Sequence, residues 1–281
     1  MPEPIHVVYE DEAGRVLVTN SATAFDERVT TTDVVVAGSF SGEQAVAMAL
    51  RRGARAFLGS TAGIGLDGAG VSGLALGERL GVPVAASSEY SALLGDGMDN
   101  YTNGVIARVN EVARALGVRE EMPCAEAATL LLKAHPGTVG RVDVEVDKRR
   151  VIAYDGPEGQ VVTMISATLA TADNTGQVIC AGSHAAALAG LRISEFSFPI
   201  AGFISNDAGV GKDRAGIAGL DILDAAGVPA ATVGAMSARI GSGASTYADG
   251  VISHSNAVAS ALGVRAGQSA RVACLAMLSA Q

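Results

Sequence analysis

Hydrophobic and polar residues follow two periods along the first part of the chain. Runs rich in β-branched residues, separated by turn residues, predict strands. We expect these strands at residues 6–10, 15–20, 33–38, 54–60 and 82–87. Apolar residues at helical spacing, followed by glycine, predict helices. We expect these helices at residues 42–53, 71–81 and 104–117. Because strands and helices alternate, the pattern predicts an α/β fold whose parallel or mixed sheet carries flanking helices.

The same order of signals returns in the second half of the chain. When residues 60–118 are aligned with residues 206–264, at a constant offset of 146, 27 of 59 positions are identical. The similarity extends upstream with small gaps, where Ser183 corresponds to Ser39. We therefore expect a tandem duplication of one α/β unit of about 120 to 140 residues, with the two units related by a pseudo-twofold axis.

This duplication predicts three regions. Residues 1–122 form the first repeat, and residues 151–281 form the second. Between them, residues 123–150 are expected to hold a connecting helix at 124–134 and a short strand at the sequence VDVEV, residues 142–146.

Composition and charge narrow the class of partner. The formal net charge is −9 and the basic residues form no cluster, which argues against nucleic-acid binding and favours a small molecule. The N-terminus has acidic residues where a secretory signal needs basic and then apolar ones, and no apolar run is long enough to cross a membrane. We therefore expect a cytoplasmic protein. Cys124, Cys180 and Cys274 show no metal or redox spacing and are expected to be reduced, buried thiols.

Comparison of the two halves identifies candidates for chemistry in the glycine-rich segment 205–217. Asp207 and Lys212 stand where the first half has Thr61 and Leu66, and the alternative to a functional role is a solvated surface pair. A glycine-rich loop between a strand and a helix favours an anion, because its backbone N–H groups and the helix N-terminus point toward it. Gly209, Gly211 and Asp213 complete this candidate site, although each matches a residue of the first half and can serve the turn alone. The segment matches neither nucleotide-binding motif, the Walker A or the G-x-G-x-x-G pattern.

A second polar segment, residues 234–256, carries an arginine that the first half lacks. Arg239 replaces Leu93, in a context that is otherwise apolar, and is expected to bind a substrate carboxylate or phosphate. The alternative is a structural salt bridge to Asp249 or Asp213. Further ligand-binding candidates in this segment are Ser245, Thr246, Tyr247, Asp249 and His254. Acidic residues of the first half, in segment 87–104, can contribute the opposite wall, pair with Lys212 or Arg239, or form a solvated loop.

Two histidines are candidates for proton transfer. His184 replaces Phe40 just after a predicted strand, and His254 replaces Arg108 on a predicted helix face. Imidazole suits general acid–base catalysis near neutral pH, so His184 is the first candidate. The alternatives are a half-buried structural imidazole or an oligomer contact. A divalent metal could be held by His184, His254, Asp207 and Asp213, but no HxH or HxxxH spacing supports it, so we predict no metal and no cofactor.

These candidates lead to competing functional hypotheses. The preferred one is a cofactor-independent enzyme, a hydrolase, lyase or isomerase, that acts on a small anionic metabolite. The metabolite is bound mainly by the second repeat, at the cleft between repeats, with His184, Asp207, Lys212 and Asp213 as catalytic residues. The alternatives are a non-catalytic binding or sensor protein and a structural subunit. Alanine- and glycine-rich helices also favour a homo-oligomer.

Overall fold

The computed structural model describes residues 4–140, 142–144 and 149–280, and the chain divides into two compact units. Unit 1 comprises Met1–Ile64, Ala69–Val146 and Gly211–Asp213. Unit 2 comprises Gly65–Gly68, Asp147–Val210 and Arg214–Gln281. Each unit therefore takes in a short segment from the other half of the sequence.

Unit 1 is built on a six-stranded mixed sheet in the order β1-β2-β3-β4-β5-β6. Strands β2 to β5 are parallel to one another, and β1 and β6 are the antiparallel edges. The strands are β1 (His6–Asp11), β2 (Gly14–Thr19), β3 (Asp33–Phe40), β4 (Ala56–Ser60), β5 (Val84–Ser87) and β6 (Ile106–Val109). The helices are α1 (Glu43–Arg51), α2 (Gly73–Leu80), α3 (Gly97–Asn103), α4 (Glu111–Ala115) and α5 (Cys124–Leu131).

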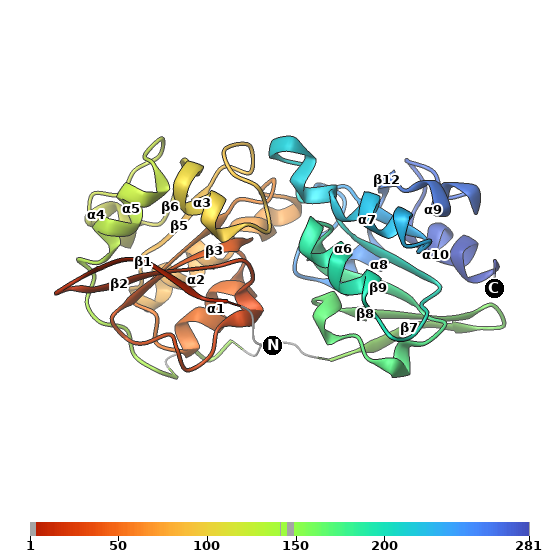
Figure 1. Cartoon of the computed structure of the whole chain (residues 1–281), viewed down its shortest axis with the longest axis horizontal. Helices are drawn as coiled ribbons and strands as arrows, with labels where there is room; N and C mark the ends of the chain where they lie inside the picture. The colour runs from red at the N-terminus through yellow and green to blue at the C-terminus, as the bar shows by residue number, and fades with distance from the viewer. Residues whose placement is uncertain (1–3, 141, 145–148, 281) are drawn as a thin grey trace. The chain divides into compact units, whose positions relative to one another are not determined.

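Helices cover both faces of this sheet (Figure 1). Because consecutive strands lie side by side, right-handed crossovers carry their connecting helices to one face. The buried residues of α1 and α2 accordingly share one core with Val35 and Phe57 of the sheet. Helix α5 packs with Val34 and Leu58 in the core on the opposite face.

Unit 2 has a second six-stranded mixed sheet, in the order β12-β11-β10-β9-β8-β7. Here β8 to β11 are parallel, and β7 and β12 are antiparallel edges. The strands are β7 (Val151–Gly156), β8 (Gly159–Met164), β9 (Val178–His184), β10 (Gly202–Asn206), β11 (Ala230–Val233) and β12 (Ile252–Ser255). The helices are α6 (Ala187–Ser194), α7 (Gly219–Ala225), α8 (Gly243–Ala248), α9 (Ala257–Ala261) and α10 (Ala270–Leu278).

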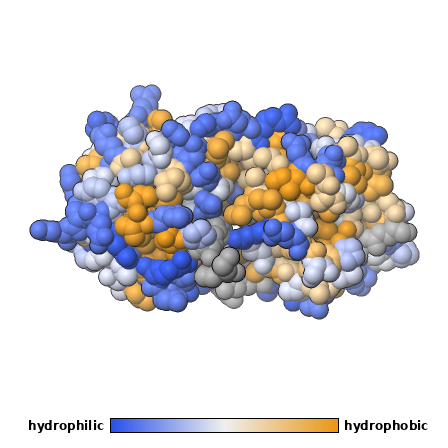
Figure 2. Space-filling view, viewed as in Figure 1, coloured by the Kyte–Doolittle hydropathy of each residue, from blue (hydrophilic) through white to orange (hydrophobic). Residues whose placement is uncertain are grey.

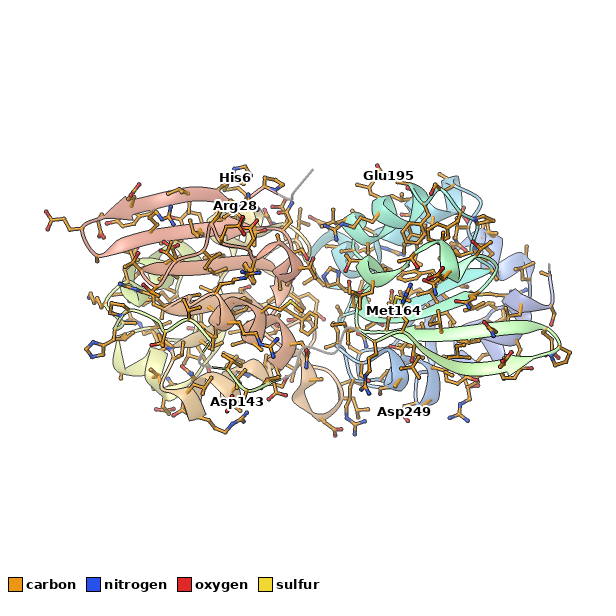
Figure 3. The ribbon with its side chains drawn as sticks, turned by 90° about the horizontal axis from the view of Figure 1, so that it is seen from below. His6, Arg28, Asp143, Met164, Glu195 and Asp249 are labelled. Carbon is orange, nitrogen blue, oxygen red and sulfur yellow. The ribbon has the colours of Figure 1, made fainter. Side chains whose placement is uncertain are left out.

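The layers of unit 2 follow the same rule as those of unit 1. Ile193 of α6 and Leu223 of α7 pack with Phe203 in one core. Met277 of α10 packs with Ile204 in the core on the other face. Figure 3 shows this division: Glu195, which follows α6, and Asp249, which follows α8, lie on opposite sides of Met164 in β8. Figure 2 shows hydrophobic residues at the surface over α6, where Leu191 is 48% exposed.

The strands and the first two helices confirm the pattern-based predictions, but the predicted helix at 104–117 is wrong. Residues Ile106–Val109 form β6, and a short helix α4 begins only at Glu111. Asn110 causes the break, because its Oδ1 accepts from Ala113 N at 2.9 Å and from Val84 N at 3.1 Å. The side chain thus caps the helix and ties it to β5. His254 likewise lies on strand β12, so its predicted helical position is also wrong.

The segment predicted to connect the repeats is only partly a connector. Helix α5 belongs to unit 1 and buries Cys124, Ala127, Ala128 and Leu131 in its core. Residues 142–144 of the predicted VDVEV strand have no regular structure, and residues 145–146 lie outside the described part of the chain.

Two of the cysteines that are isolated in the sequence meet in the folded core. Cys180 on β9 and Cys274 on α10 lie together in the core, with their Sγ atoms 3.5 Å apart. The contact with Cys274, together with burial, raises the pKa of the Cys180 thiol, so it is protonated at neutral pH. In the described residues, no helix has the length and apolar character needed to span a bilayer.

Candidate functional site

The carboxyl ends of β9 and β10 bring two of the predicted catalytic residues to adjacent strand ends. His184 is the last residue of β9, and its Cα partner on β10 is Asn206. Asp207 follows Asn206 directly, so it leaves the sheet beside His184. This is the edge at which α/β sheets collect their ligand-binding groups, because the loops after parallel strands gather there.

His184 is held as a neutral imidazole. Its Nδ1 accepts a hydrogen bond from Ala186 N, the N-cap residue of α6, at 3.3 Å. The ring proton is therefore assigned to Nε2, which becomes the donor. Burial of the ring lowers the pKa of His184 to about 4. At neutral pH the residue is thus a hydrogen-bond donor without charge.

Asp207 is 6% exposed and is anchored through one carboxylate oxygen only. Its Oδ1 accepts from Gly209 N at 3.0 Å and from Ala235 N at 2.9 Å. In the described part of the chain, its Oδ2 has no hydrogen bond. The side chain is therefore fixed in orientation while one oxygen keeps its capacity to accept a proton.

The glycine-rich loop after Asp207 has an unusual backbone. Ala208, Gly209, Val210 and Gly211 all have positive φ, at 51°, 76°, 66° and 67°. Such values cost an L-residue about 1–2 kcal/mol each, so Ala208 and Val210 require local support, whereas the two glycines adopt them freely. Val210 N donates to Asp207 O at 2.8 Å, and Gly216 N donates to Val210 O at 2.8 Å. Residues 62–65 have the same signs of φ, so this turn belongs to the fold of both units.

Lys212 does not join His184 and Asp207. Gly211, Lys212 and Asp213 belong to unit 1, where Lys212 Nζ lies 3.1 Å from Asp99 Oδ2. Lys212 N also donates to Glu89 O at 2.8 Å, and a Cβ added to Gly211 would lie 2.7 Å from the same oxygen. Gly211 is therefore needed for close backbone packing. Asp213 is exposed and makes no hydrogen bond or ion pair in the described structure.

Asp99 is a strongly bound carboxylate. It accepts from Leu93 N at 2.6 Å and from Asn103 Nδ2 at 2.7 Å, in addition to Lys212. Burial acts to raise the pKa of Asp99, but these donors outweigh it and hold the pKa below its usual range. The predicted pairing of Lys212 with an acidic residue of segment 87–104 is thus confirmed.

Arg239 lies in a network of exposed charges, so the expectation of an apolar context is wrong. Its side chain is 52% exposed and forms ion pairs with Asp67 and, at 3.8 Å, with Asp249. The alternative of a salt bridge to Asp249 is confirmed. Ser245 Oγ completes the network by accepting from Arg239 N at 3.0 Å and donating to Asp249 at 2.7 Å.

The other candidates from segment 234–256 serve the fold. Thr246 is fully buried, and its Oγ1 donates to Ala181 O at 3.0 Å. Tyr247 packs against the core with Arg271 stacked 5.4 Å from its ring centre, and burial raises the pKa of its hydroxyl. His254 Nδ1 lies 3.2 Å from Ser253 Oγ on the antiparallel edge strand. None of these contacts reaches His184 or Asp207.

Two serines that the sequence analysis did not select lie at the same edge. Ser183 Oγ and Ser205 Oγ are both buried, and neither has a hydrogen-bond partner among the residues that the structure describes. The corresponding positions in unit 1 are Ser39, whose hydroxyl accepts from Ala22 N at 2.9 Å, and Gly59. Comparison of the halves could have singled out Ser205, since it replaces a glycine. Ser183 could not be found this way, because its residue type is unchanged.

Neither a search for metal-binding groups nor comparison with known proteins identifies the site. Within the described residues, no group of three or more histidine, cysteine or acidic side chains could hold a metal ion. No protein-family model, no curated protein and no solved structure matches the chain.

Proposed function

We propose that the protein is an enzyme that transforms a small metabolite through His184 and Asp207. The observation that carries the proposal is a neutral N–H donor and a one-sidedly anchored carboxylate on adjacent strand ends. The corresponding residues of unit 1 are Phe40 and Thr61, which provide neither group. The reaction class is that of a hydrolase, lyase or isomerase whose acid–base groups come from the protein's own side chains.

The two groups take complementary roles. A neutral imidazole can polarise a carbonyl oxygen and stabilise the negative charge that develops there, without first losing its own proton. Asp207 Oδ2 then accepts a proton from the substrate or from an attacking water. The buried hydroxyl of Ser183, next to His184, supplies another hydrogen-bonding group at this edge.

The substrate class that fits these roles is a small metabolite with a carbonyl group. We expected the substrate to be an anion because of Lys212 and Arg239, but each of these cations already has a carboxylate partner. An anionic substrate would need one of them to exchange that partner. The proposal therefore rests on His184 and Asp207 alone.

Turnover can be tested by incubating the protein with a fractionated small-metabolite extract and following every component by mass spectrometry. We expect one metabolite to be consumed and one product to appear. His184→Phe and Asp207→Thr, which install the residues of unit 1, should each slow this conversion by about 100-fold or more. Glu195→Gln, a change after α6, is the control and should keep the parent rate. Full conversion by both site variants would overturn the proposal.

A binding protein is the second candidate, and the low pKa of His184 favours it, because a group with a pKa of about 4 holds a ligand oxygen well and accepts protons weakly at neutral pH. The same extract fractions distinguish the two candidates in a thermal-shift assay. The protein is a binding protein if one fraction meets three conditions. It raises the Tm of the parent, it does not raise the Tm of His184→Phe, and none of its metabolites is consumed.

We also propose that the two units arose by tandem duplication. Three observations support this: the 27 identities in 59 positions, the same strand order in each sheet and the recurrence of individual hydrogen bonds. As an example of the last, Phe57 N donates to Pro83 O at 3.2 Å and Phe203 N donates to Pro229 O at 2.9 Å, both at the offset of 146. On this proposal the catalytic groups appeared in the second unit only.

A further inference from the structure

An apolar cavity of about 510 Å³ opens at the amino ends of β9, β10 and β11 in unit 2. It lies at the opposite edge of the parallel strands from His184 and Asp207, so it is separate from the proposed catalytic site. The lining residues share an apolar character and come from the strand starts and from α9 and α10: Thr175, Gly176, Pro199, Ile200, Ala201, Pro229, Val258, Leu262, Met277 and Ala280.

The corresponding place in unit 1 is filled by an arginine. Arg55 N donates to Asp33 O at 2.9 Å, and Ala201 N donates to Gln177 O at 2.9 Å, so Arg55 and Ala201 hold the same position in their sheets. The Arg55 side chain is 4% exposed and extends to the carbonyl of Leu132 at the end of α5. Ala201 ends at its Cβ, and the space that a long side chain occupies in unit 1 becomes part of the cavity in unit 2.

The charges around this position are also different in the two units. In unit 1, Asp33 is fully buried and accepts two hydrogen bonds from Arg15, at 2.9 and 2.8 Å. In unit 2, the corresponding contact joins two neutral amides, Gln177 Nε2 and Gln160 Oε1, at 2.7 Å. The cavity therefore has neither the cation of unit 1 nor the carboxylate that would attract one.

The side chains that line the cavity leave no hydroxyl that needs a polar group of a ligand. Its one hydroxyl, on Thr175, donates to Ala172 O at 2.6 Å. Met277, which is 1% exposed, presents a flexible thioether that adapts to the shape of a bound molecule. The volume lies within the range of about 300–1,000 Å³ that is typical of small-molecule sites.

We propose that this cavity binds an uncharged, mainly apolar small molecule. Burial of such a molecule removes apolar surface from water on both sides, which drives binding without a compensating ion pair. A cationic ligand is disfavoured because Gln177 stands where Asp33 neutralises arginine in unit 1.

The test uses N-phenyl-1-naphthylamine, an uncharged apolar dye whose fluorescence rises in apolar surroundings. The parent protein should bind it saturably. Ala201→Arg, the residue of unit 1, should weaken binding by at least about tenfold. Because a buried arginine can prevent folding, Ala201→Met fills the same space without charge and should have the same effect. Ala248→Arg, an exposed position at the end of α8, is the matched control and should bind as the parent does.

Four outcomes would overturn the proposal. One is the absence of saturable dye binding by the folded parent protein. Another is unchanged binding by both Ala201 variants when circular dichroism shows that they are folded. The third is self-association of the parent, measured by light scattering, that Ala201→Met abolishes while the dye never binds, since a second copy of the chain would then be the occupant. Binding of n-butylguanidinium in place of the dye would overturn the uncharged ligand class.

Discussion

The two units differ in the ionisable groups that they place at the two edges of similar sheets. In unit 1, Asp33 and Arg55 are buried at the amino edge, and the carboxyl end of β3 has Phe40. In unit 2, the amino edge has Gln177 and Ala201, and the carboxyl end of β9 has His184. Buried charges that only hold a fold can be exchanged for amides and alanine. The comparison therefore separates positions that hold unit 1 together from the position at which we propose a catalytic group in unit 2.

The largest expected effect comes from the buried carboxylate of unit 1. Asp33→Ala should lower the free energy of unfolding of this unit by about 3–5 kcal/mol, because Arg15 and Arg55 lose their shared counter-charge. Gln177→Ala, the corresponding change in unit 2, removes a neutral hydrogen bond and should cost about 1 kcal/mol. Hydrogen exchange followed by mass spectrometry measures the two units separately.

A double variant sharpens this comparison. Arg15→Gln with Asp33→Gln gives unit 1 the amide pair of unit 2 and should recover part of the stability that Asp33→Ala loses. The comparison breaks if Asp33→Ala and Gln177→Ala destabilise their units equally. In that case the charges of unit 1 contribute no more than amides would.

The next effect concerns the pH dependence of unit 2. His184 has a pKa of about 4 in the folded state, below its ordinary value of 6.5. Between these values the unfolded chain binds more protons than the folded one, so the stability falls as the pH drops from about 6.5 to about 4. The loss from this residue should reach about 3 kcal/mol. His184→Phe, which installs the residue of unit 1, should remove that part of the pH dependence.

Urea denaturation of the parent and of His184→Phe at several values between pH 4 and pH 7 measures the difference directly. Other titrating groups cancel in this difference, and His135→Gln, at an exposed position, should leave the parent curve unchanged. Parallel stability curves for the parent and His184→Phe would show that the imidazole is not held neutral. The polarising role proposed for it would then lose its basis.

The sequence predicted the elements whose signals are local. Helix α2 ends at Leu80 because Gly81 adopts the left-handed conformation, a signal that the glycine itself carries. Residues 104–117 could not be divided correctly in the same way. Their apolar residues fit a helix, and only the contacts of Asn110 with the backbone of β5 show that a strand comes first. Tertiary contacts decided against the local pattern there.

In the candidate site, too, residues marked by local sequence signals could be predicted, and pairs formed by tertiary contacts could not. His184 and Asp207 were found because a strand end and a changed residue type are both visible in the sequence. For Arg239, the ion pair with Asp249 was among the predicted alternatives, but the pair with Asp67 could not be found, because Asp67 belongs to unit 2 only through the segment Gly65–Gly68. The pairing of Cys180 with Cys274 was missed for a similar reason, since residues on a strand and a distant helix meet only in the folded core.

The smallest expected effect distinguishes the two cations that the sequence analysis assigned to an anion. Lys212 and Asp99 are 29% and 15% exposed, whereas Arg239 and Asp67 are 52% and 56% exposed. Exposed pairs are screened by water and salt, so Arg239→Leu should cost less than about 0.5 kcal/mol. Lys212→Leu should cost about 1 kcal/mol. The low pKa of Asp99 means that this carboxylate is charged at neutral pH, and it loses one of its donors in the variant. The Asp99 contribution is present above its ordinary pKa of 3.8 and disappears as the pH falls through its lower folded value.

A double-mutant cycle of Lys212→Leu with Asp99→Asn, at low and high salt, measures the coupling between these two residues. A larger loss for Arg239→Leu than for Lys212→Leu would mean that Arg239, and not the partly buried lysine, is the cation on which the structure depends.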